Sequence, residues 1–183
     1  MRIVGAAAVG VVCLLIWSAV AEFGAAAQVR SRDGNITIMD NCLPGDPGWT
    51  PSGGCAAGPN VGDVSQSEFG QLLTSPLITG LVGHPSWRNE PSHLVAPRTG
   101  RVRVTNRGGR THTLTKVADF GGGSVGMFNI AMTKAPECPP SPAEIQDALP
   151  PGQSMTLTDL EPGLNKLQCC FHPWMRATIR VVD

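Results

Sequence analysis

Charged side chains are scarce in this sequence, and neither sign prevails. They make up 15% of the 183 residues, with 14 basic and 14 acidic groups and a formal net charge of zero. No basic stripe is visible, which argues against nucleic acid as a partner. Internal repeats and low-complexity tracts are also absent. With only four histidines, the chain has no material for a second histidine-rich metal cluster.

Glycine and proline, in contrast, are abundant. The chain has 22 glycines and 16 prolines, and such a turn-rich composition favours short strands over long helices. The length suits one modest domain with a real hydrophobic core.

The N-terminal segment has the features of a secretory leader. Arg2 is followed by an uncharged stretch, residues 3–21, and small-residue cleavage sites follow at residues 19–21 and 25–27. We therefore predict a signal peptide over residues 1–27 and a periplasmic or secreted mature chain from Gln28. The alternative is an uncleaved anchor facing outside, since about 20 apolar residues can span a bilayer. Only in that case would the membrane be a partner.

The cysteine count is informative in such an oxidising compartment. Beyond the leader the chain has Cys42, Cys55, Cys138, Cys169 and Cys170, an odd number that cannot all pair within one chain. Cys42 and Cys55 flank a loop rich in proline and glycine, and we predict a disulfide there. A bridge from Cys138 to either member of the adjacent pair would leave one thiol. The alternative is a stray or intermolecular thiol.

The pattern of the remaining chain predicts mostly strands. We expect an N-terminal extension over residues 28–86, with a strand at 35–39, the disulfide-pinned loop, and a short helix that starts from a capping box at 65–68. From residue 87 to 183 we expect one short helix at 141–144 and strands at 101–105, 111–117, 153–159, 164–169 and 175–182. Short strands separated by turns indicate a β-sandwich or a barrel.

One short segment gathers three potential metal ligands. Cys169, His172 and Met175 supply a thiolate, an imidazole and a thioether, the ligand types of copper electron-transfer sites. Neighbouring side chains on an extended chain point to opposite faces, so Cys169 and Cys170 cannot both reach one ion. We favour Cys169, because the spacing from Cys170 to His172 leaves little chain to fold both around a metal.

A further imidazole must come from elsewhere in the chain, and His112 is the best candidate. Alternation in residues 111–117 places His112 on the same face as Leu114, which points it inward if Leu114 is buried. The alternative is an ordinary buried histidine. We interpret His84 and His93, both near prolines, as ordinary surface residues.

The segment Cys169-x-x-His172-Pro173-Trp174-Met175-Arg176 resembles the copper loop of the cupredoxin family, in its amicyanin-like form with two residues between His and Met. Residues 106–113, with His112 after a turn, resemble the upstream ligand region of that family. The resemblance covers residues 87–183.

This resemblance implies an all-β Greek-key sandwich that holds one type 1 copper ion between His112, Cys169, His172 and Met175. It implies a one-electron carrier that catalyses no reaction and serves an unidentified redox partner protein. Cys170 departs from the family pattern, and a disulfide with Cys138 would account for it.

Residues next to His172 are candidates for partner docking. The outer edge of His172 is a potential electron port, and Pro173 and Trp174 could form an apolar docking patch beside it. Trp174 could equally pack in the core, as tryptophan commonly does.

Two other functions fit the same residues. One is a copper-binding delivery or storage protein without a redox role. The other is a metal-free secreted domain in which Cys169 and Cys170 both form disulfides. An enzyme is the least favoured reading, because a single type 1 site offers no position for a substrate.

Overall fold

The computed structural model describes residues 33–58, 62–74, 83–129 and 131–183. These residues belong to one compact unit, 31–183. The predicted signal peptide, residues 1–27, lies outside the described residues. Within the described ranges, no helix is both long and apolar enough to cross a membrane.

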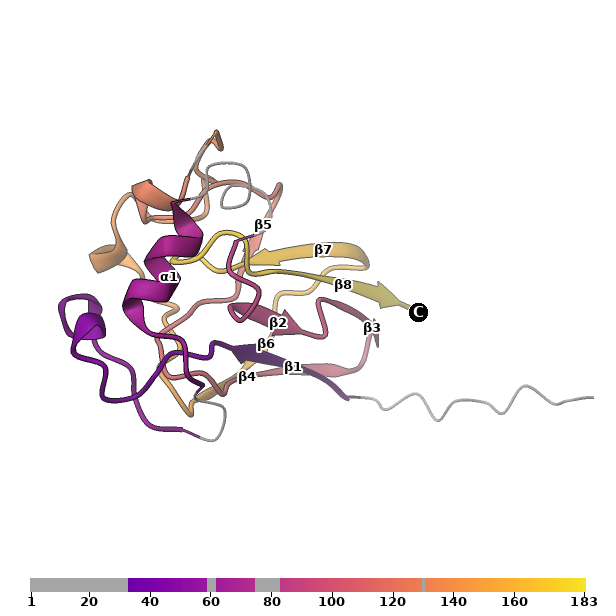
Figure 1. The fold of residues 1–183 in the computed structure, drawn as a ribbon. Helices are drawn as coiled ribbons and strands as arrows, with labels where there is room; N and C mark the ends of the chain where they lie inside the picture. Colours follow the sequence, from indigo (N-terminus) through magenta and orange to yellow (C-terminus); the bar gives the residue numbers. More distant parts are fainter. Residues whose placement is uncertain (1–32, 59–61, 75–82, 130) are drawn as a thin grey trace, which may run out of the picture. The chain divides into compact units, whose positions relative to one another are not determined.

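Two four-stranded sheets form the unit (Figure 1). The first sheet has the order β2 (Arg88–Glu90), β1 (Asp33–Met39), β4 (Arg101–Asn106) and β6 (Ser154–Leu157). The second has the order β3 (His93–Pro97), β8 (Arg176–Val182), β7 (Gly163–Gln168) and β5 (Thr115–Val117).

The chain passes repeatedly from one sheet to the other. β1 pairs in parallel with β4, and β3 pairs in parallel with β8, whereas the other pairs are antiparallel. Parallel neighbours cannot be joined by a tight hairpin, so the connections must cross between the layers. The predicted all-β Greek-key sandwich is confirmed.

Alternation along the strands explains why two sheets form one core. In β1 and β4 the buried residues Ile36, Ile38, Val102 and Val104 alternate with more exposed ones. β8 shows the same pattern, and Ile179 is fully buried. A period of two places these apolar side chains on one face, where they join a single buried cluster.

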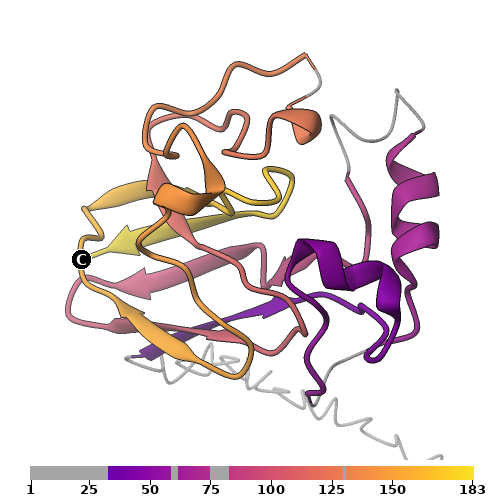
Figure 2. The same cartoon turned by 90° about the vertical axis from the view of Figure 1, so that its left-hand side faces the viewer.

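Helical segments gather near the ends of the strands (Figure 2). The helix α1 (Gln66–Leu73) begins after Ser65, whose Oγ accepts a hydrogen bond from the Glu68 backbone amide at 3.1 Å, as the capping signal predicts. The described ranges also contain three short 3-10 helices: η1 (Pro47–Ser52), η2 (Gly126–Phe128) and η3 (Pro142–Glu144). The helix predicted at 141–144 is therefore a single 3-10 turn.

Residues 33–58 are built into the sandwich. β1 lies between β2 and β4, so it is an interior strand of its sheet. The division drawn at residue 87 therefore passes through this sheet, with β1 before it and β2, β4 and β6 after it. A strand at 35–39 was predicted from the sequence, whereas its pairing with β4, in which Asp33 lies opposite Arg101, was not.

The predicted strand at 111–117 is shorter than expected. Only Thr115–Val117 pairs with β7, while His112 forms an isolated bridge with Leu149. His112 and Leu114 are nevertheless both buried, with 0% and 2% exposure. The inward direction predicted for His112 is correct.

The interior position of β1 can be tested by mutation. Ile38→Ala should lower the free energy of unfolding by about 2–5 kcal/mol, because it leaves a cavity between the sheets. Asn35→Ala, an exposed position on the same strand, should change it by less than about 0.5 kcal/mol. Urea unfolding of both variants checks this. Equal, small effects would show that β1 is an appendage to the fold.

Candidate metal centre

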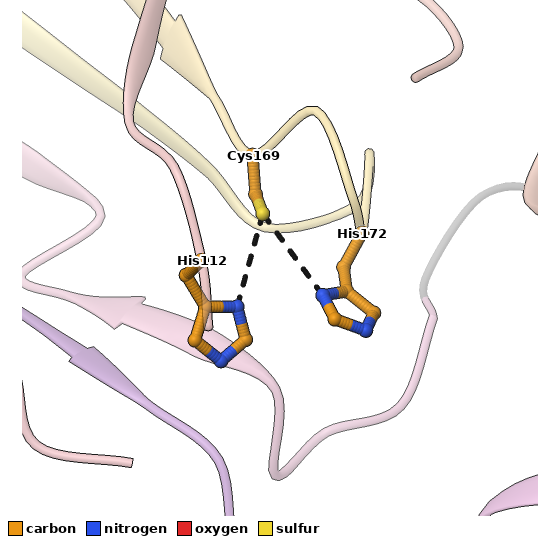
Figure 3. Close-up of side chains that lie close together, drawn as sticks. All are labelled: His112, Cys169 and His172. Atoms are coloured by element: carbon orange, nitrogen blue, oxygen red, sulfur yellow. Dashed lines mark hydrogen bonds between the residues drawn. The ribbon is translucent and has the colours of Figure 1, made fainter. Parts of the chain in front are cut away.

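Three buried side chains converge in the structure (Figure 3): His112 from the segment before β5, and Cys169 and His172 from the connection between β7 and β8. The Sγ of Cys169 lies 3.7 Å from Nδ1 of His112 and 3.9 Å from Nδ1 of His172. One ligand atom from each residue lies within 4.8 Å of the others. The structure thus brings together His112, Cys169 and His172, three of the four ligands that the sequence selected from separate segments.

The loop from Cys169 to Met175 joins β7 to β8 and is closed by its own backbone. The Cys169 amide donates to the Met175 carbonyl at 3.0 Å, and the Met175 amide donates to the His172 carbonyl at 2.9 Å. Met175 is 1% exposed and belongs to the same core cluster as Cys169. The bond from Met175 to His172 closes a tight turn at the end of this loop.

Cys169 and Cys170 face opposite directions, as the alternation predicted. Cys169 is a free buried thiol, and Cys170 forms a disulfide with Cys138. The Cys170 amide donates to Oγ1 of Thr113, and the Thr113 amide donates to Sγ of Cys169 at 3.4 Å. These two hydrogen bonds hold the segment that carries His112 against the loop at residues 169–175, called the thiol loop below.

Asp40, which sequence reasoning missed, fixes the other side of His112. Its Oδ2 lies 2.7 Å from His112 Nε2, and both side chains are 0% exposed. With Nε2 donating to Asp40, Nδ1 is free to face the thiol. Asp40 is one of 14 acidic residues, and no motif distinguishes it from the others.

The carboxylate of Asp40 is held by the backbone around it. The amides of Cys42 and Gly109 donate to Oδ1, and the amide of Arg110 donates to Oδ2. A Cβ on Gly109 would lie 2.6 Å from Cys42 Sγ, so only glycine allows this close approach. The disulfide between Cys42 and Cys55 is present, as predicted.

Burial and mutual contacts shift the pKa of each side chain in this group. Burial by itself raises the pKa of the Cys169 thiol. The hydrogen bond and charge of His112, together with backbone donors, lower this pKa by a larger amount, so the net shift is downward. Burial lowers the pKa of His112, yet its bonds to Asp40 and Cys169 raise it to about 9. Burial and the neighbouring charge of His112 hold the pKa of His172 well below its usual value.

These properties suit a soft metal ion. A thiol with a lowered pKa and two imidazole nitrogens form a mixed sulfur and nitrogen donor set, the kind that binds copper. His172, with a strongly lowered pKa, is neutral and can donate a lone pair to a metal. The donors are buried and fixed by second partners, which favours one coordination geometry.

Two predictions of surface exposure are wrong. His84 is 3% exposed, because its ring stacks on Phe69 with centroids 5.6 Å apart and an interplanar angle of 25°. Pro173 and Trp174 are also buried, so they form no exposed docking patch. A side chain at Gly83 would overlap the Trp174 ring, and the core alternative for Trp174 is the correct one.

The edge of His172 is covered as well. His172 is 7% exposed and lies against Phe128, with ring centroids 5.8 Å apart and an interplanar angle of 25°. Phe69 of α1 meets the same ring edge-on at 6.3 Å. His93 alone agrees with the surface prediction: it is exposed and lies within hydrogen-bond distance of Thr178.

Comparison with known proteins gives likenesses in structure only. No protein-family model and no curated sequence matches the chain. A purple cupredoxin from Nitrosopumilus maritimus superposes with a TM-score of 0.43 at 18% identity, covering 82% of this chain and 100% of that one. A reduced amicyanin variant gives a TM-score of 0.34 at 25% identity, covering 51% of this chain and 71% of that one. A second reduced amicyanin variant gives 0.36 at 22%, covering 56% and 80%.

These superpositions are too loose to carry an argument, so the assignment rests on the strands and side chains. The chain has two four-stranded sheets with crossing connections, and a His/Cys/His group formed by the loop between the last two strands and by His112 before β5. These features define a cupredoxin-like sandwich. This is the family that the loop sequence resembles.

The contact between Asp40 and His112 can be tested by exchanging the carboxylate for an amide. In Asp40→Asn the amide NH2 would face two donors, the Arg110 amide and His112 Nε2, so the free energy of unfolding should fall by about 1–3 kcal/mol. Copper affinity should fall about 10- to 100-fold, because the imidazole loses its fixed orientation.

Urea unfolding of the metal-free protein and competition with a copper chelator measure the two effects. Asp159→Asn, at an exposed position, is the control and should leave both unchanged. An Asp40→Asn protein with unaltered copper affinity would show that Asp40 does not orient His112 for a metal.

Proposed function

We propose that the chain is a periplasmic or secreted one-electron carrier that holds one type 1 copper ion between His112, Cys169, His172 and Met175. The observation that carries this proposal is the buried convergence of one thiol and two Nδ1 atoms within 4.8 Å. A bound copper ion would alternate between Cu(I) and Cu(II) and so store a single electron.

The protein residues would keep the site unchanged between the two charge states. Cys169 supplies the thiolate, and the Thr113 amide donates to its sulfur. His112 is held by Asp40, and the loop that carries His172 is closed through the backbone of Met175. Groups fixed in this way move little when the charge of the site changes, which favours rapid electron exchange.

Two observations favour a metal-binding carrier over a metal-free domain and over an enzyme. Cys169 is a free thiol, whereas a metal-free disulfide domain would pair both adjacent cysteines. In the part of the chain that the structure describes, this is the one group of three or more His, Cys, Asp or Glu residues able to hold a metal. A site of this kind stores an electron and does not require a substrate position, so we propose no catalytic role.

The exported location and the partner belong to the same proposal. The two disulfides require an oxidising compartment, in keeping with the leader-like residues 1–27. The electron donor or acceptor is proposed to be another protein of unknown identity. A delivery protein with the same ligands would differ in releasing Cu(I) readily to a chelating acceptor.

The thiolate assignment can be tested on residues 28–183 loaded with Cu(II). The wild type should show an intense visible charge-transfer band and narrow copper hyperfine splitting in its electron-spin spectrum. Cys169→Ser should abolish the band, because the sulfur that gives rise to it is gone.

The matched control removes the neighbouring disulfide. The double variant Cys138→Ser/Cys170→Ser should keep the band but lose about 2–5 kcal/mol of stability, because an unfolded chain without the cross-link has more conformational entropy. A coloured Cys169→Ser protein would overturn the thiolate assignment, and a colourless wild type would overturn the function.

The role of Met175 can be tested separately. Met175→Leu should retain copper and shift its reduction potential, because an axial thioether tunes the ion while the other three ligands hold it. Voltammetry and copper analysis of the purified variant measure both properties. Loss of copper would show that Met175 is a main ligand.

A further inference from the structure

A cavity of about 660 Å³ lies directly beside the His/Cys/His group. Its walls come from η1, α1, the segment around Arg110, η2 and the loop that carries His172. This volume is typical of sites for small organic molecules, which range over about 300–1,000 Å³. No sequence pattern predicted a binding position for a small molecule at such a site.

Five aromatic rings contribute to the walls. Trp49, Phe69, Phe128 and Phe171 line the cavity together with His172. Trp49 and Phe69 are themselves 3% and 5% exposed, with ring centroids 5.3 Å apart, so this side of the cavity is rigid. Aromatic walls favour a flat ligand that can stack or meet the rings edge-on.

One charged side chain lines the cavity among the described residues, and it is cationic. Arg110 lies over the Trp49 ring at 4.8 Å and donates to the carbonyls of Ser52 and Gly54, which fix its guanidinium in the wall. No Asp or Glu is among the described lining residues. An apolar cavity with a single fixed cation is complementary to a flat molecule that carries one anionic oxygen.

We propose that this cavity binds a small aromatic carboxylate, with its ring between the aromatic walls and its carboxylate toward Arg110. The bound ring would contact His172, a proposed copper ligand, but binding itself does not require copper. The proposal therefore goes beyond electron transfer and can fail or succeed independently of it.

Gly70 offers a way to fill the cavity without disturbing the fold. It lies on α1 and lines the cavity, and a Cβ built there has no atom within 4 Å. Replacing a helical glycine also favours the helix. Gly70→Phe should therefore occupy the cavity, whereas Gln71→Phe, at the next and exposed position, places the same ring outside the set of lining residues.

The probe is 2-naphthoate, titrated by calorimetry into the metal-free and the copper-loaded protein. We expect saturable binding to both forms, at least tenfold weaker binding by Gly70→Phe, and unchanged binding by Gln71→Phe. No saturable binding at millimolar probe, or equal binding by Gly70→Phe and wild type, would overturn the proposal.

Charge preference is tested at Met127, which lines the cavity and is 77% exposed, so that substitutions there spare the core. Met127→Glu should bind 2-naphthoate severalfold more weakly than Met127→Lys, because only the Glu side chain repels a carboxylate. The cationic analogue 2-naphthylmethylamine should bind at least tenfold more weakly than 2-naphthoate. Equal binding of the two probes would overturn the assignment of an anionic ligand.

The two proposals give distinguishable results. A protein that binds 2-naphthoate but develops no charge-transfer band would refute the copper function alone. A coloured protein that does not bind 2-naphthoate would refute the cavity ligand alone.

Discussion

The buried hydrogen bond between Asp40 and His112 connects the frame of this protein to its reactive group. Asp40 follows β1 in the first sheet, and His112 precedes β5 in the second. A buried carboxylate is costly unless it is fully paired. Asp40 meets this requirement with three backbone donors and the imidazole, so the segments at residues 40–42 and 108–112 must keep their positions. The orientation of His112 toward the thiol follows from that constraint.

The thiol loop is held from its other side by a comparable set of contacts. Cys169 faces the histidines while Cys170 is bonded to Cys138, and the Thr113 backbone and side chain contact both residues. Two adjacent cysteines thus have different roles because alternate side chains of an extended chain point to opposite sides. Without the direction that β7 imposes, either cysteine of the pair could face the histidines.

Much of this arrangement was predictable from local patterns. The strand predicted at 35–39, the alternation at 101–105, the capping box at 65–68 and the cysteine spacing all led to elements or pairings that the structure contains. Asp40 and the burial of His84 and Pro173 were not predictable, and for Trp174 the sequence left burial and exposure equally open. Each depends on a contact with a distant segment, such as Phe69 of α1 against His84, and a single sequence carries no local signal for such contacts.

The sequence by itself determined the chemistry of the group: which donors exist, that five cysteines beyond the leader cannot all pair, and that strand periodicity turns His112 inward. Only the tertiary structure decided how that group is enclosed. His172 is buried behind Phe69 and Phe128, and the cavity lies next to it, where α1, η1 and η2 meet the strand ends. The pairing of Asp40 with His112 likewise joins two segments that are far apart in the chain. Ligand types and alternation are properties of neighbouring residues, whereas enclosure depends on packing between segments far apart in the chain.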